Sequence, residues 1–453
     1  MNVHFIAIGG SAMHNIALAL HDKGYTVTGS DDQIFEPSRT RLQQAGILPE
    51  KDGWFPEKIT NDLDAVILGM HARVDNPELL AAKEKGVKVY SYPEFLYQQT
   101  RDKKRVVIAG SHGKTSITSM ILHVLQYHDR PCDFMVGAQL DGFDRMVSLE
   151  KDTDIAIFEG DEYLSSPIDR RPKFFHYQPH VALISGIAWD HINVFPTFDG
   201  YVDQFRQFAH SVEAGGELIW FEGDEHLQTI VQEGGMACRQ MAYRAHPHAI
   251  EHGHTYLMHD GRTIPVKIFG RHNMENLEGA RLVCESVGIS RDEFYEAIAT
   301  FTGAARRLEL LESTMTTSIY RDFAHSPSKL KATTAALKSQ YPDRTLVACM
   351  ELHTFSSLSA EFLDHYRDTM KDADRAIVFF NPEALAHKKL PMITKEQVKS
   401  GFGGNVEVIT NTVDLQALLY DLPLEDVSLL LMSSGNFGGM DIPGLAQSLI
   451  QGI

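Results

Sequence analysis

The chain has 453 residues, 60 of them acidic and 42 basic, with a formal net charge of −18. This balance argues against a general nucleic-acid or anionic-membrane binder, because such proteins need a basic face to neutralise phosphates. The length favours about three domains. The four cysteines are far apart and form no CxxC pair, which argues against a disulfide framework or a structural zinc site.

The start of the chain predicts a strand and not a signal peptide. It reads MNVHFIAIGG, without a basic segment followed by a long apolar one. No stretch approaches the roughly 18 uninterrupted apolar residues of a membrane helix. We therefore expect a soluble, cytoplasmic protein.

Short apolar runs alternate with longer amphipathic segments, which is typical of α/β folds with parallel sheets. The predicted strands are Val3–Ile8, Ala65–Leu68, Val106–Ala109, Ile155–Phe158, Val181–Ile184, Leu346–Met350, Ala376–Phe380 and Ser428–Met432. Ligands of open α/β sheets bind at the carboxyl ends of the strands, so the loops that follow these runs are candidate sites. The charged stretch Thr100–Arg105 indicates one domain boundary and Leu311–Thr317 a second. The predicted domains are therefore 1–103, 104–311 and 312–453.

The first predicted strand ends in a glycine loop. The segment Ile8–Met13 resembles the dinucleotide-binding fingerprint, but its glycines are adjacent and the third glycine is missing. Gly29–Asp32 ends the presumed second strand. A phosphate-bearing ligand fits both features, whereas the broken fingerprint makes a redox dinucleotide less convincing.

The strongest signal is a phosphate loop between a strand and a helix. The segment Gly110–Ser116 reads GSHGKTS, and the helix-like run Ile117–Tyr127 follows it. Backbone N–H groups and the helix N-terminus would face an anion, Lys114 would neutralise phosphate oxygens, and the Thr115 hydroxyl would coordinate Mg²⁺. Ile108 stands where the strict pattern has its first glycine. The alternative is a strand–turn–helix junction that happens to contain glycine and lysine.

Acidic residues follow two other apolar runs. Phe158–Leu164 reads FEGDEYL and Phe221–Leu227 reads FEGDEHL. A carboxylate at a strand's carboxyl end can coordinate Mg²⁺ beside a nucleotide, because hard cations prefer oxygen ligands. A solvated acidic turn is the alternative. We favour a metal ligand for Glu159, downstream of the lysine loop, and a surface turn for Glu222, which has no comparable partner.

Two further polar pairs come at strand ends or helix starts. Asp190 and His191 follow an apolar strand, and they either serve the site or cap and support the structure. Asn273 and Asn276 lie three apart on one face of a starting helix. Their amides could contact an adenine edge or phosphate, or could cap the helix.

Taken in order, these motifs resemble those of the Mur ligases of bacterial cell-wall synthesis. The motifs are HFIAIGGSAM, GSHGKTS, EGDEY, the DH pair at 190–191, GRHNMEN, GAARRLE and RDFAHSP, and they span essentially the whole chain. The resemblance implies three domains: a Rossmann-like N-terminal UDP-sugar domain, a central P-loop-type ATPase domain and a Rossmann-like C-terminal domain. It also implies ADP-forming amide synthesis, with ATP and Mg²⁺ required. The carboxylate of UDP-N-acetylmuramate would attack the γ-phosphate to give an acyl phosphate, which an amine then attacks.

The resemblance also implies roles for individual residues. The nucleotide phosphates and Mg²⁺ would be held by Gly110, Ser111, His112, Gly113, Lys114, Thr115 and Ser116. Glu159 and His191 would hold a second Mg²⁺, and Asn273 and Asn276 would contact the nucleotide. Arg307 and Asp322 would reach phosphate and ribose from the third domain. Gly10, Ser11, Ser30 and Asp31 would line the UDP site.

The resemblance implies that the acceptor amine would be an amino acid or a tripeptide. DEYLSSPIDRRPKFFHYQP and MSSGNFGGM resemble the branch that adds L-alanyl-γ-D-glutamyl-meso-diaminopimelate, whereas His71–Pro77 looks more like the branch that adds L-alanine. Glu351–Ser357 contains no arginine, which both branches tend to carry there. A single alanine leans on such a charged clamp, while a peptide can spread its contacts over Lys329, Lys331 and Ser433–Gly439.

We therefore expect the tripeptide as acceptor and keep L-alanine as the alternative. If L-alanine is the acceptor, Arg306 or Arg321 would supply the charged clamp that an alanine ligase needs. A second alternative is a nucleotide-binding homologue that has lost ligation. The Lys114 loop argues against a nicotinamide dehydrogenase.

Overall fold

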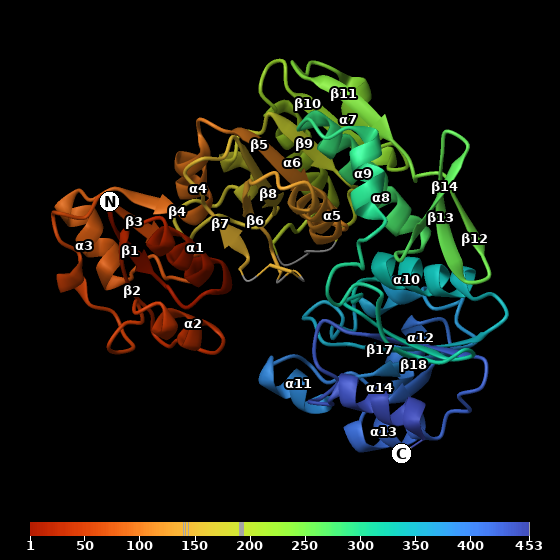
Figure 1. The fold of residues 1–453 in the computed structure, drawn as a ribbon. Helices are drawn as coiled ribbons and strands as arrows, with labels where there is room; N and C mark the ends of the chain where they lie inside the picture. The colour runs from red at the N-terminus through yellow and green to blue at the C-terminus, as the bar shows by residue number, and fades with distance from the viewer. Residues whose placement is uncertain (139, 141, 144, 190–193, 453) are drawn as a thin grey trace. The chain divides into compact units, whose positions relative to one another are not determined.

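The computed structural model describes residues 1–138, 140, 142–143, 145–189 and 194–452 (Figure 1). It divides into two compact units. The first comprises Met1–Ile187, Val194–Arg244 and Gly279–Ala297, and the second comprises the other described residues. Within the described residues, no helix combines the length and apolar character that crossing a membrane requires.

The first unit begins with a four-stranded parallel sheet in the order β2-β1-β3-β4. Its strands are β1 Asn2–Ile6, β2 Thr26–Ser30, β3 Ala65–Leu68 and β4 Val89–Ser91. Its helices are α1 Ser11–Asp22, α2 Ser38–Gln44, the 3₁₀ helix η1 Pro56–Lys58, α3 Pro77–Lys85 and α4 Tyr92–Thr100. Helix α4 begins where Ser91 and Glu94 form a reciprocal capping box. Strand β1 is shorter than the predicted Val3–Ile8, because Ala7 has a φ of 67° and turns the chain into the glycine loop.

A seven-stranded sheet follows in the order β11-β10-β9-β5-β8-β6-β7. Its strands are β5 Lys104–Ala109, β6 Asp133–Met135, β7 Val147–Ser148, β8 Ile155–Gly160, β9 Val181–Ile184, β10 Glu217–Phe221 and β11 Arg239–Tyr243. All pairs are parallel except β6 with β7. The associated helices are α5 Lys114–Tyr127, the 3₁₀ helix η2 Lys173–His176, α6 Phe198–His210, α7 Glu225–Glu233 and α9 Arg291–Ile298.

The register of this sheet brings three strand ends together. Ala109 at the end of β5 pairs with Gly160 of β8 on one side and with Ile184 of β9 on the other. The loops after these three strands therefore leave the same edge. The residues of Val106–Ala109 are fully buried, which anchors the central loop on a rigid strand.

The second unit contains two sheets. Strands β12 His248–Glu251, β13 His254–His259 and β14 Arg262–Val266 form an antiparallel sheet. The order β15-β16-β20-β17-β18-β19 describes a six-stranded sheet, parallel except at β15. Its strands are β15 Glu309–Ser313, β16 Ser318–Asp322, β17 Thr345–Glu351, β18 Arg375–Phe379, β19 Glu407–Ile409 and β20 Val427–Met432. Helix α8, Arg271–Ser286, crosses the division between the units at Gly279.

Both faces of the six-stranded sheet are buried. Ala348 and Met350 of β17 pack in one apolar cluster with residues of α10 Pro327–Gln340 and α12 Lys395–Gly401. Val347 and Cys349 pack in a second cluster with α13 Thr412–Tyr420 and α14 Ile442–Gln451, on the other side (Figure 1). Helices α11 Pro382–His387 and η3 Leu363–Tyr366 complete this part.

All eight predicted strands are present, within a few residues of the predicted ends. The division into domains 1–103, 104–311 and 312–453 stays a prediction. Strand β15 spans the second of these boundaries and pairs with β16.

Candidate active site

The loop Gly110–Gly113 joins the buried strand β5 to the first turn of α5, which begins at Lys114. Gly110 has a φ of 127°, and a Cβ there would overlap the Ser185 hydroxyl and lie 2.9 Å from the Ser185 nitrogen. Only glycine fits this position without strain. The Ser111 N–H donates to the Gly186 carbonyl at 2.9 Å, so the loop rests on the segment that follows β9. This arrangement presents the N-terminus of α5 as an anion site.

Lys114 is a largely buried cation, its side chain 14% exposed, and it has two oxygen partners. Its Nζ donates to the Gly110 carbonyl at 2.7 Å and contacts Glu162 Oε2 at 3.0 Å. Burial disfavours the charged lysine, but the nearby carboxylates, Glu162 foremost, outweigh it and hold the pKa of Lys114 above its usual value. Lys114 therefore stays protonated and positive at the mouth of the loop.

Glu162 belongs to a network that the sequence analysis did not assign. The Tyr201 hydroxyl donates to Glu162 Oε1 at 3.2 Å and lies 2.8 Å from the Ser111 hydroxyl. Glu162 is fully buried, and Tyr201 comes from α6. The network fixes Glu162, and through it the position of Lys114. The only signal for Glu162 in the sequence was its place as the third and last acidic residue of EGDE.

Glu159 ends β8 beside Thr115. The Thr115 hydroxyl donates to Glu159 Oε2 at 3.2 Å, and the Gly137 N–H donates to the same carboxylate. Glu159 Oε1 is buried and has no hydrogen-bond partner among the described residues. Burial, together with the charge of Asp161, raises the pKa of Glu159 to about 7.

The side-chain oxygen atoms of Thr115 and Glu159 are suitable ligands for a hard cation. An unpartnered buried carboxylate oxygen beside a hydroxyl offers the oxygen ligands that Mg²⁺ prefers. The structure thus brings two of the three predicted metal ligands together, while Asp190 and His191 lie outside the described residues. Among the described residues, no three His, Cys, Asp or Glu side chains gather into a metal-binding group.

The second FEGDE copy has a different surrounding. Glu222 receives two hydrogen bonds from Arg244, at 2.6 and 2.7 Å, and Arg244 lowers the pKa of its carboxyl. This partner is an exposed arginine and no part of the loop site, so it is not comparable to Lys114. Asp224 instead caps α7 and accepts the Ile187 N–H at 2.7 Å, which anchors the segment after β9. Sequence reasoning missed this supporting role.

In the first sheet, the predicted UDP-site residues lie around one loop. Asp31 accepts the N–H groups of Gly9 at 2.7 Å and Asp32 at 2.9 Å, so it holds the glycine loop in place. Burial and neighbouring Asp32 raise the pKa of Asp31 to about 6. Ser30 receives a hydrogen bond from Lys58 Nζ at 3.3 Å. Lys58 is a cation at this site that the sequence analysis did not single out.

The four other residues predicted to contact the nucleotide all belong to the second unit. Asn273 Nδ2 donates to the Phe269 carbonyl at 2.9 Å, so this amide ties the start of α8 to the preceding loop. Asn273 and Asn276 are both buried.

Arg307 and Asp322 lie together in this unit. Asp322 accepts the Leu308 and Ala324 N–H groups at 2.7 and 2.6 Å. The Arg307 guanidinium stacks 4.8 Å from the Phe323 ring centroid. Burial raises the pKa of Asp322, and the positive charge of Arg307 opposes that rise.

Comparison with known proteins places these features in one family. A profile described as "Mur ligase family, catalytic domain" matches residues 2–104, and one described as "Mur ligase middle domain" matches residues 108–284. The chain belongs to the Mur ligase family, whose members are ADP-forming ligases. The family predicted from the sequence is thereby confirmed.

Two kinds of relative are similar over nearly the whole chain. The UDP-N-acetylmuramate–L-alanyl-γ-D-glutamyl-meso-2,6-diaminoheptandioate ligase of Escherichia coli K12 is 27% identical, covering 100% of this chain and 98% of the relative. The UDP-N-acetylmuramate–L-alanine ligase of Lactiplantibacillus plantarum is 30% identical, covering 92% of each.

Solved structures show the same fold. A murein peptide ligase from Psychrobacter arcticus 273-4 matches with a TM-score of 0.65 and 23% identity, over 100% of this chain and 98% of that one. The alanine ligase from Thermotoga maritima matches with a TM-score of 0.69 and 18% identity, over 100% and 98%. The predicted α/β class with Rossmann-like parallel sheets is confirmed.

Proposed function

We propose that this chain is an ATP-dependent, ADP-forming ligase that joins the carboxylate of UDP-N-acetylmuramate to an amine. The observation that carries the proposal is that the largely buried cation Lys114 lies beside the Thr115–Glu159 oxygen pair at one edge of a parallel sheet. Phosphoryl transfer needs neutralisation of charge and alignment more than covalent help. This edge supplies fixed charge where phosphate oxygens would lie.

The reaction proceeds in two steps. A muramate carboxylate oxygen attacks the γ-phosphorus of ATP, and ADP leaves with the electron pair of the broken P–O bond. The neutral amine then attacks the carbonyl carbon of the acyl phosphate, loses a proton, and inorganic phosphate departs. Mg²⁺, when bound, would neutralise negative charge on the reacting oxygens.

The residues of this chain then have distinct tasks. Lys114 meets the β/γ oxygens, and the N–H groups of Gly110–Ser116 cradle the phosphates. Thr115 and Glu159, with His191, offer metal ligands. Glu162 keeps Lys114 charged and aimed while the loop is empty, and must yield its ion pair when phosphate arrives. The remaining nucleotide contacts are assigned to Asn273, Asn276, Arg307 and Asp322.

UDP-N-acetylmuramate is the acyl donor of this reaction. Its binding site, the donor site, lies at the glycine loop of the first sheet. Gly10, Ser11, Ser30 and Asp31 line it, and Lys58 beside Ser30 adds a positive charge for the diphosphate. Asp31 supports the loop through the Gly9 N–H, so its contribution is to shape the loop.

The acceptor we propose is the tripeptide L-alanyl-γ-D-glutamyl-meso-diaminopimelate. Glu351 is buried and accepts the Phe437 N–H at 2.8 Å and the Ser433 hydroxyl, so it shapes the Ser433–Gly439 loop. The segment Glu351–Ser357 offers no arginine to clamp a lone alanine carboxylate. L-Alanine is the second candidate, favoured by the 30% identity to an alanine ligase.

Steady-state kinetics with both amines tests the proposal. Phosphate release is followed with ATP, Mg²⁺ and UDP-N-acetylmuramate, and kcat/KM is compared for the tripeptide and L-alanine. We expect the higher value for the tripeptide. A higher value for L-alanine assigns the chain to alanine addition, and no turnover with either amine contradicts ligation.

A further inference from the structure

Helix α1 of the first sheet packs against the β6–β7 hairpin of the central sheet. The Met146 N–H, next to β7, donates to Asn15 Oδ1 at 3.3 Å. The Met146 sulfur lies 3.8 Å from the Ser11 hydroxyl and 3.6 Å from Asn15 Nδ2, and Arg145 pairs with Asp22. Residues 11, 15 and 22 fall on one face of α1. The contact thus runs the length of the helix that begins at the glycine loop.

The Asn15 side chain is fixed at both ends of its amide. It is fully buried, and its Nδ2 donates to the Ser11 carbonyl at 2.9 Å and lies 3.0 Å from His14 Nε2. Its oxygen accepts from Met146. One side chain therefore joins Ser11, the first residue of α1 after the glycine loop, to the hairpin.

The same hairpin reaches Glu159 from its other strand. The Val136 N–H donates to the Met146 carbonyl at 2.9 Å. The next residue, Gly137, donates its N–H to Glu159, and a Cβ at Gly137 would lie 2.9 Å from Glu159 Oε2. A short run of hydrogen bonds thus leads from Asn15 to the carboxylate beside Thr115.

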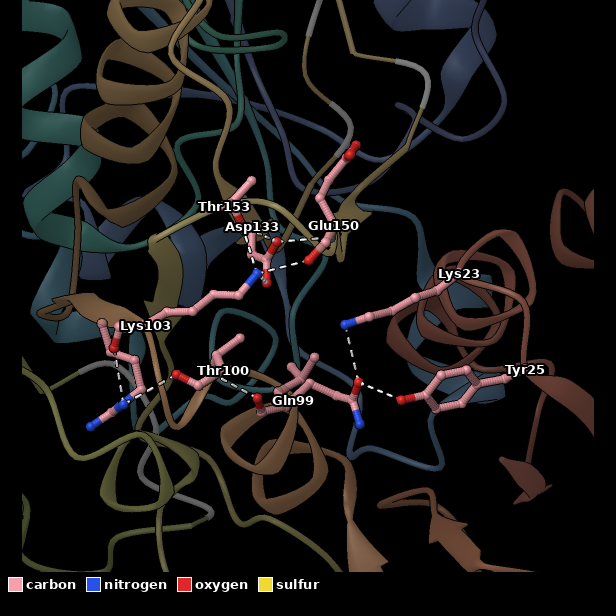
Figure 2. Close-up of polar contacts among 10 residues, drawn as sticks. Lys23, Tyr25, Gln99, Thr100, Lys103, Asp133, Glu150 and Thr153 are labelled. Carbon is pink, nitrogen blue, oxygen red and sulfur yellow. Dashed lines mark hydrogen bonds and ion pairs between the residues drawn. The ribbon is translucent and has the colours of Figure 1, made fainter.

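The base of the hairpin is clamped. Lys103 Nζ donates to Asp133 Oδ2 at 2.8 Å, to the Glu150 carbonyl at 2.8 Å and to Thr153 Oγ1 at 2.6 Å. Figure 2 shows this cluster, with Lys23 and Tyr25 both reaching Gln99 nearby, at 3.2 and 3.0 Å. A largely buried ion pair thus holds the base of the hairpin, so we expect a displacement at Met146 to pass along the strands toward Gly137 and not to move the whole hairpin.

We propose that Asn15 is a positioning residue that couples occupancy of the donor site to the geometry of Glu159. When UDP-N-acetylmuramate binds at the glycine loop and Ser11, Asn15 fixes Met146. The hairpin then sets Gly137 against Glu159, and the site for Mg²⁺ and nucleotide is completed. This inference rests on the proposed function. Thermodynamic linkage makes the coupling reciprocal. The Mg²⁺–nucleotide complex should therefore lower the Kd of UDP-N-acetylmuramate by the same factor.

Titration calorimetry on the full chain tests this coupling without turnover. The Kd of the Mg²⁺ complex of β,γ-methylene-ATP is measured with and without saturating UDP-N-acetylmuramate. In the unmodified protein we expect the donor to tighten this Kd by about 5-fold or more, in the usual range for coupled sites. In Asn15→Ala we expect the two values to agree within about twofold, because the bond to Met146 is lost.

Two further variants distinguish loss of the hydrogen-bonded path from Asn15 to Glu159 from a general loss of structure. Asn15→Asp keeps an oxygen acceptor for the Met146 N–H, so we expect it to retain more of the coupling than Asn15→Ala. Gln99→Ala removes the contact with Lys23 and Tyr25 but leaves this path, so its coupling should match the unmodified protein. Circular dichroism and melting curves check that each variant is folded. If a variant does not fold, hydrogen exchange of the Met146 amide is measured in the unmodified protein instead. We expect this exchange to slow when UDP-N-acetylmuramate binds.

The measurements distinguish failure of this inference from failure of the proposed function. If both ligands bind the unmodified protein independently, or if Asn15→Ala keeps the full coupling, the inference is overturned while the proposed function stands. If the unmodified protein binds no donor at all, the proposed function fails and the inference falls with it.

Discussion

Replacing Glu159 by glutamine separates the cost of burying a charge from the benefit of binding a cation. The ordinary pKa of this carboxyl is 4.5, and burial with the charge of Asp161 raises it to about 7. Between these values the folded state holds the proton and the unfolded state does not, so the unfolding free energy falls as pH rises through this window. The values differ by 7 − 4.5, about 2.5 pH units, which corresponds to roughly 3 kcal/mol.

Glutamine removes this titration, so Glu159→Gln should stabilise the cation-free protein. The expected gain in unfolding free energy is about 1 kcal/mol at pH 5.5 and about 3 kcal/mol at pH 8.5. Urea unfolding in EDTA at both pH values measures it. Glu222→Gln is the matched control, because Glu222 is an accessible carboxyl whose pKa Arg244 lowers, and it should gain nothing at pH 8.5. Mg²⁺ with nucleotide should then stabilise the unmodified protein and not Glu159→Gln.

Equal gains at the two pH values would refute the reasoning, because the effect would not follow the ionisation of Glu159. A variant less stable than the unmodified protein at pH 8.5 would show that the ionised carboxylate contributes favourable contacts that outweigh its burial.

Further substitutions test the site. Lys114→Ala should reduce ATP-dependent ligation by more than ~100-fold, as loss of a group that neutralises transition-state charge does, and near-normal phosphate release would make the loop structural. Since Lys114→Ala leaves Glu162 buried without its cation, the variant should also melt at a lower temperature, and adding Glu162→Gln should restore the melting temperature but not the activity. Glu159→Ala should sharply raise the Mg²⁺ concentration needed for half-maximal rate and Glu222→Ala should not; matching titration curves would remove the distinction between the two copies. Gly110→Ala should abolish nucleotide binding measured by calorimetry, because its φ of 127° and its contact with the next loop exclude a Cβ, and an unchanged Kd would contradict the described loop.

Local sequence order predicted the part of the site that is local. The strand, the glycines and the Lys114–Thr115 pair follow one another within a few residues, and the loop forms between β5 and α5 as expected. The side-chain network around Lys114 could not be predicted from local sequence order. Tyr201 reaches Glu162 across 39 positions, and only the packing of α6 on the sheet decides that contact.

The two FEGDE segments show why a motif alone is insufficient. Each follows an apolar strand, so the sequence presents them as near equals. Strand order separates them, because β8 pairs directly with β5 while β10 lies beyond β9. Glu159 therefore ends beside Thr115, and Glu222 ends beside Arg244. The contact of Asn15 with Met146, 131 positions apart, was beyond sequence reasoning for the same reason.

An isotope experiment tests most directly the central claim, that the muramate carboxylate is activated as an acyl phosphate at this site. UDP-N-acetylmuramate labelled with ¹⁸O in its carboxylate is turned over with ATP, Mg²⁺ and the amine that gives the higher kcat/KM, and the phosphate is analysed by mass spectrometry. The carboxylate oxygen that attacks phosphorus leaves with it, so we predict one ¹⁸O atom per phosphate released, in step with ADP and amide product. Unlabelled phosphate, or AMP in place of ADP, would contradict the account.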